Sequence, residues 1–183
     1  MVPLSALWLP ILLSAVFVFI AANILWMALP FWHRHDYGRL PDEGGVLAAL
    51  AKTPSGQYVA PMMDWKNTTP EQRAAAQAGP MAYLVVRNPS GFSFPKTILL
   101  YFVYLVVVCA VVGYATGITL GTGEPYLRVF RVAGTAGILA FSFNSIADSI
   151  WYGKPWPVTF KIIIDGVIFG LLIAGTFGWL WPR

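Results

Sequence analysis

The sequence predicts an all-α membrane protein: a bundle of four transmembrane helices with a small α/β insertion between the first helix and the second. Of its 183 residues, 57% are hydrophobic and only 11% are charged, and the mean hydropathy is +0.65. Soluble domains carry about a quarter charged residues. The apolar residues are also grouped into uncharged stretches of about 20 residues, the length at which a helix crosses a bilayer core of about 30 Å.

The four spans follow from these stretches and from the breaks between them. We expect helices over residues 4–31, 97–116, 126–150 and 160–181. The first stretch has no basic residue before it and is longer than the core of a signal peptide, so we expect a retained helix. The last two joints are short and rich in Gly or Pro, which makes consecutive helices antiparallel neighbours.

The chain therefore divides into a first transmembrane helix, 1–32, a polar insertion, 33–96, and three further helices, 97–183. The insertion contains two predicted helix starts. One follows the acidic residues at 42–43, and the other has Thr69 as N-cap, Pro70 in the first turn and Gly79 as its stop. Residues 56–62 and 81–86 read as short strands. A segment of this size buries little core, so we expect it to rest on the bundle or on a partner.

In a membrane protein, a formal net charge of +4 reflects membrane topology and contact with anionic lipid. We therefore expect no nucleic-acid partner. Lys and Arg near the helix ends number five on the side of the insertion and three on the other. The two sets are Arg34, Arg39, Lys96, Lys154 and Lys161, against Arg128, Arg131 and Arg183. This bias predicts a cytoplasmic insertion 33–96 with both termini outside.

A cluster of polar residues belongs to the third and fourth spans: Asn144, Asp148, Lys161 and Asp165. Ionisable groups inside a membrane are costly and are candidates for ion or proton paths. Both aspartates lie near the same interface, however, and neither is at the bilayer centre. We therefore favour structural pairing with Lys154 or Lys161, which would join the third helix to the fourth. An ion path through the two aspartates and Asn144 is the alternative.

The run His33-Arg34-His35-Asp36 ends the first apolar stretch. His33, His35 and Asp36 are weak candidates for a metal site, since imidazole and carboxylate bind transition metals. The favoured interpretation is a helix leaving the membrane, with Arg34 near lipid phosphate.

Lipid contact is also expected of Arg128 and Arg131, at the start of the third span. No histidine lies within a span and Cys109 is the single cysteine, so no haem or other cofactor is expected.

Small residues recur every four positions on two helices. One stripe comprises Gly166, Gly170, Ala174 and Gly178, and the other Gly113, Gly117 and Gly121. Such stripes let helix backbones approach closely in lipid. The pattern is equally compatible with packing inside the bundle and with contact to another subunit.

The stretches HRHDYGRLPDE, from His33, and DSIWYGKPWPVTFKIIIDGVIFGLLIAGTFGWLWPR, from Asp148, resemble a group of small, uncharacterised bacterial inner-membrane proteins. The resemblance implies a bacterial inner (cytoplasmic) membrane and four spans, and it implies no activity.

The sequence carries no nucleophile elbow, P-loop, zinc-protease or dinucleotide-binding motif, so we expect a protein that is not an enzyme. The leading hypothesis is an accessory or assembly subunit of a larger respiratory or photosynthetic complex, in contact with the lipid bilayer and with other subunits or itself. Its alternatives are a small oligomeric transporter or channel using Asn144, Asp148 and Asp165, and a membrane metal-binding protein using His33, His35 and Asp36.

Overall fold

The computed structural model describes all residues except 65 and 88. The chain forms two compact units, which are considered separately. One comprises Met1–Gly38 with Phe94–Arg183, and the other comprises Arg39–Ser93. The six residues 33–38, part of the predicted insertion, thus belong to the helical unit.

The helical unit contains four helices long and apolar enough to span a membrane: Trp8–Ala28, Phe94–Thr119, Tyr126–Tyr152 and Trp156–Trp179. The four predicted spans are therefore confirmed as helices, and together they indicate a multi-pass membrane protein. Within them lie α1 (Trp8–Asn23), the π-helical turn η2 (Ile24–Ala28), α5 (Phe94–Thr119), α6 (Tyr126–Ser142), α7 (Asn144–Tyr152) and α8 (Trp156–Trp179).

The helix bounds differ from those expected where proline is involved. The first helical path breaks at Leu29, and α2 (Pro30–His33) restarts it, because Pro30 has no N–H to continue the preceding ladder. The last helix begins at Trp156, earlier than expected, because Pro157 is tolerated in the first turn.

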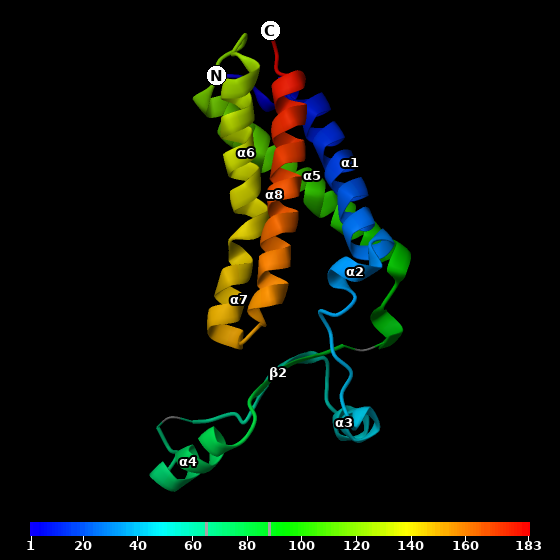
Figure 1. Cartoon of the computed structure of the whole chain (residues 1–183), viewed down its shortest axis with the longest axis vertical. Coiled ribbons are helices and arrows are strands. Elements are labelled where there is room, and N and C mark those ends of the chain that lie inside the picture. The colour runs from blue at the N-terminus through cyan, green and yellow to red at the C-terminus, as the bar shows by residue number, and fades with distance from the viewer. Residues whose placement is uncertain (65, 88) are drawn as a thin grey trace. The chain divides into compact units, whose positions relative to one another are not determined.

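Within this unit α6 and α8 run side by side, and both chain ends lie at the same end of the bundle (Figure 1). The core between the helices is aliphatic and aromatic. Its fully buried members include Val18, Leu105, Val129, Ile173 and Phe177.

The small-residue stripe of α8 is used inside the bundle. A β-carbon added at Gly170 would lie 2.7 Å from the backbone nitrogen of Ile138, and one at Gly166 would lie 2.8 Å from the carbonyl carbon of Phe141. Farther along the same stripe, Gly134 packs on Ala174 and Tyr126 on Gly178. The whole stripe thus faces α6, where backbones approach closely.

The other small-residue stripe, Gly113, Gly117 and Gly121, is only partly packed against other segments of the unit. Gly113 faces Ile11 and Phe177, and a β-carbon at Gly117 would lie 2.5 Å from the carbonyl oxygen of Val2. Gly121 lies beyond the end of α5, and a β-carbon added there would have no neighbouring atom within 4 Å.

The unit Arg39–Ser93 contains α3 (Glu43–Leu50), β1 (Gly56–Ala60), α4 (Pro70–Ala78) and β2 (Ala82–Val86). The strands pair antiparallel, with Gly56 opposite Val86 and Ala60 opposite Ala82. The predicted start of α4 is confirmed: Thr69 and Gln72 form a reciprocal capping box, and Gly79 is the C-cap.

Local hydrogen bonds, and not a core, order this second unit. None of the side chains described in residues 39–93 is buried. Several large apolar side chains are exposed instead: Leu47, Met62, Met81, Tyr83 and Val85. The unit thus has regular elements without the buried apolar area that normally stabilises them.

Candidate functional site

The candidate site is a buried polar network where the chain leaves the first span. The amide of Asp36 donates to the carbonyl of His33 in a turn that follows α2. The two side chains are three residues apart and so point to the same face. Arg34 and His35, between them, are exposed.

The network consists of four contacts, three of which join residues 32–36 to α8. Lys161 Nζ donates to Asp36 Oδ1 at 2.5 Å, and Asp36 Oδ2 lies 2.5 Å from His33 Nδ1. On the other side of the ring, His33 Nε2 lies 2.8 Å from Asp165 Oδ2, while the indole of Trp32 donates to Asp165 Oδ1, also at 2.8 Å. The side chains of His33, Asp36 and Asp165 are 2–4% exposed, so solvent contributes little to these contacts.

This geometry fixes how many protons the site holds. Each nitrogen–oxygen contact of His33 needs a proton between its two atoms, and a neutral imidazole carries only one N–H. Either His33 is an imidazolium between two carboxylates, or it is neutral and one aspartate is protonated. In both states the three groups carry one net negative charge, which the Lys161 ammonium offsets. The network is therefore electrically neutral, as burial requires.

The charge of Asp36 is stabilised by its partners. Burial by itself would raise the pKa of this carboxyl, but the hydrogen bonds from Lys161 and His33 and their positive charges outweigh it, so the pKa of Asp36 lies below its usual value. Asp36 is thus held as an anion, and its two oxygens are divided between Lys161 and His33.

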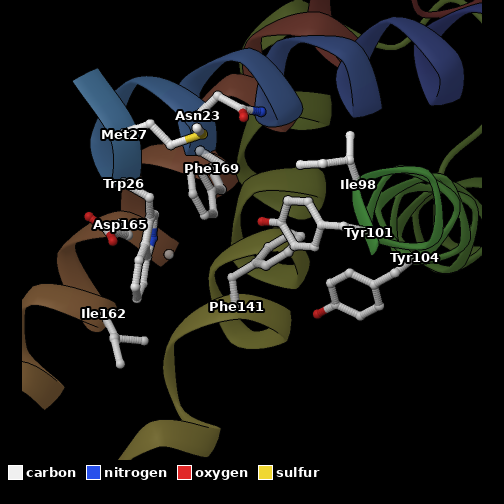
Figure 2. Close-up of a pocket in the computed structure, with 12 residues that line it drawn as sticks. Asn23, Trp26, Met27, Ile98, Tyr101, Tyr104, Phe141, Ile162, Asp165 and Phe169 are labelled. Carbon is white, nitrogen blue, oxygen red and sulfur yellow. The ribbon is translucent and has the colours of Figure 1, made fainter. Parts of the chain in front are cut away.

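A pocket adjoins the network through two residues. Trp26 stacks on the ring of His33, with 3.8 Å between centroids and 13° between planes, and its indole also lines a pocket of about 390 Å³. Asp165 lines the same pocket, which is otherwise mostly aromatic and aliphatic (Figure 2).

The polar cluster predicted in the third and fourth spans is divided between two places. Lys161 and Asp165 join the buried network, but their partners come from residues 32–36 and not from the third span. Asp148 instead lies 3.5 Å from Lys154, a contact that is half-exposed, and Asn144 is exposed. The predicted pairing of the aspartates with Lys154 or Lys161 is therefore right for Asp148 and wrong for Asp165.

Of the three weak metal candidates, the structure brings His33 and Asp36 together, whereas His35 is exposed and outside the network. Both ring nitrogens of His33 already face carboxylates. In the described part of the chain, no group of three or more His, Cys, Asp or Glu side chains has the arrangement of a metal site.

The arginines expected to contact lipid are on the surface. Arg34 and Arg131 are exposed, and Arg128 pairs with Glu124 at 2.9 Å. These positions are compatible with headgroup contact.

Sequence reasoning did not find the role of His33. The pair His33–Asp165 spans 132 positions, and Lys161–Asp36 spans 125. One signal was available: Asp36, His33, Lys161 and Asp165 are all predicted at the same membrane interface, where buried charges must find partners.

In comparisons with known proteins, no family model, curated protein or solved structure matches this chain.

Proposed function

We propose that this chain is a non-enzymatic integral membrane protein, an accessory or assembly subunit that binds other membrane proteins through residues 39–93. The observation that carries this proposal is that no described side chain of this unit is buried although apolar ones are exposed. Ordering the backbone costs about 1–2 kcal/mol per residue, which buried area must offset. The surface of a binding partner would bury these exposed apolar side chains and so supply the missing buried area.

The buried network then has a structural role. It ties residues 32–36 to α8 through Lys161 and Asp165. The second unit begins at Arg39, immediately beyond this tie. The network thus fixes residues 32–36, which precede the partner-binding segment in the chain, to the bundle.

We further propose that the partner is a bioenergetic complex of the bacterial inner membrane, with residues 33–96 in the cytoplasm. The positive-charge bias and the resemblance described above support this location. The small-residue stripe of α8 does not supply the partner contact, because it is covered by α6.

The test is purification of the tagged chain from its own membranes in mild detergent, with native mass and co-purifying proteins measured together. We expect stoichiometric membrane proteins that are lost when residues 39–93 are replaced by a flexible linker. The matched control is His35→Gln, at an exposed position outside that segment. A homo-oligomer with no other protein, unchanged by the replacement, would contradict the proposal and favour the transporter alternative.

A further inference from the structure

The pocket beside the network has the size and the lining residues of a small-molecule binding site. It lies among residues of all four spans, and its volume of about 390 Å³ is within the range of small-molecule sites, about 300–1,000 Å³. Five of its twelve lining residues are aromatic: Trp26, Tyr101, Tyr104, Phe141 and Phe169. Because the surrounding helix faces are apolar, its occupant has to be soluble in the membrane.

Polar atoms face this apolar space. Figure 2 shows the hydroxyls of Tyr101 and Tyr104 directed from α5 toward the side of the pocket where Trp26 and Asp165 lie. Within the described part of the chain, neither hydroxyl has a hydrogen-bond partner. Asn23 also lines the pocket, and its amide nitrogen donates to the carbonyl of Phe19, which leaves the side-chain oxygen free.

Unpaired hydroxyls in an apolar environment are costly, and a ligand that accepts from them would remove that cost. A tyrosine hydroxyl donates one hydrogen bond, so the complementary group is an acceptor such as a carbonyl oxygen. Flat aromatic walls favour a planar ring in offset or edge-to-face contact.

The charge of the neighbouring network argues against a cation. Asp165 reaches the pocket, but both its oxygens are already engaged: Oδ1 accepts from the Trp32 indole, and Oδ2 is hydrogen-bonded to His33 Nε2. With Lys161 included, the network is neutral. A neutral ligand with acceptors therefore fits better than a lipophilic cation.

We propose that this pocket binds a planar, membrane-soluble carbonyl compound of the quinone class. The ring lies among Trp26, Phe141 and Phe169, a carbonyl oxygen accepts from Tyr101 or Tyr104, and the apolar tail extends into lipid. The inference is one of binding, without a redox step, and it does not rest on the proposed function.

The experiment uses the full chain in lipid nanodiscs and a benzoquinone with a decyl tail as the probe, with binding followed by calorimetry. We expect Tyr101→Phe or Tyr104→Phe to weaken binding about tenfold, the effect of losing one hydrogen bond of about 1.4 kcal/mol. Tyr114→Phe is the matched control, since Tyr114 is an exposed tyrosine of α5 outside the pocket lining.

Decylbenzene has the same tail and a ring without carbonyls. Comparing its binding with that of the quinone distinguishes a site that recognises carbonyl groups from a groove that binds any acyl chain. We expect decylbenzene to bind at least tenfold more weakly than the quinone. Equal binding of the two compounds, or quinone binding that neither tyrosine substitution changes, would assign the pocket to lipid acyl chains and overturn the proposal. Absence of quinone binding would overturn it as well.

Discussion

His33 lies between the carboxylates of Asp36 and Asp165. Its ring can hydrogen-bond to both only while the three groups together hold one proton more than a neutral imidazole and two ionised carboxylates would. At the scale of the residue, therefore, one ring joins Asp36 and Asp165 at the end of the first span, and Lys161 offsets the negative charge that remains on the three groups. Trp26 stacks on the face of the ring.

Replacing His33 by Gln should destabilise the protein strongly. The amide cannot supply the charge that offsets two buried carboxylates, and breaking a buried ionic contact costs about 3–5 kcal/mol. His35→Gln is the matched control, because His35 is exposed and surface substitutions change stability by about 0.5 kcal/mol or less. Thermal unfolding in detergent compares the two. Similar midpoints for both variants would show that the network contributes little.

Asp36 makes stability depend on acid pH with a definite sign. Its pKa is lower in the folded protein than its ordinary value of 3.8, so the unfolded chain binds the proton more readily. This contribution is present above pH 3.8 and is lost as the pH falls through the folded pKa.

Asp36→Asn should remove that dependence. We expect the variant to be less stable at neutral pH by about 1–3 kcal/mol, since the Lys161 ammonium loses a charged partner. We also expect a flatter stability profile below pH 4 than in the unchanged protein. Denaturant or thermal unfolding at a series of acid pH values measures both. Parallel profiles for the two proteins would contradict the assigned role of Asp36.

At the scale of the element, the small residues of α8 allow its backbone to pack closely against α6. The backbone of Ile138 leaves no room for a β-carbon at Gly170. Overpacking of this kind typically costs about 1–3 kcal/mol.

Gly170→Ala should therefore destabilise the bundle relative to Gly175→Ala, where a β-carbon would meet only the Tyr126 hydroxyl, at an ordinary 3.8 Å. Both glycines lie inside α8, so the gain in helix preference on going from Gly to Ala is the same at the two positions and the comparison isolates the packing cost. Unfolding midpoints in detergent measure the difference. Equal midpoints would mean that α6 and α8 separate without penalty.

At the scale of the whole molecule, the helical unit contains the entire buried apolar cluster, whereas the unit 39–93 contains no described buried side chain. The two units should thus differ in what stabilises them. The bundle has a core of its own, and we expect residues 39–93 to depend on the proposed partner for theirs.

Replacing residues 39–93 by a flexible Gly/Ser linker of about 15 residues should leave the bundle folded. The network of residues 32–36 with α8 is retained in this variant, so its unfolding midpoint in detergent should remain close to that of the full chain. Amide hydrogen exchange of the full chain is the complementary measurement: we expect faster exchange in 39–93 without partner than in the spans. Unfolding of the truncated bundle would contradict this division.

The helical spans and most of the insertion's elements could be predicted from local patterns in the sequence. Runs of apolar residues, Thr69 as N-cap and Pro70 in the first turn are local signals, because each affects the backbone only within a few residues of itself. Such signals predict where helices begin and end, since intrachain hydrogen bonds of a helix are themselves local.

The pairing of the buried polar residues, by contrast, could be read only from the packed helices. The partner of Asp165 is His33, at a separation of 132 positions, and Lys161 reaches Asp36 across 125. Asp148, which has the same residue type and a similar predicted depth as Asp165, pairs with Lys154 instead. A buried charge takes whichever partner helix packing brings within reach, and that packing depends on side-chain fit between elements far apart in the chain.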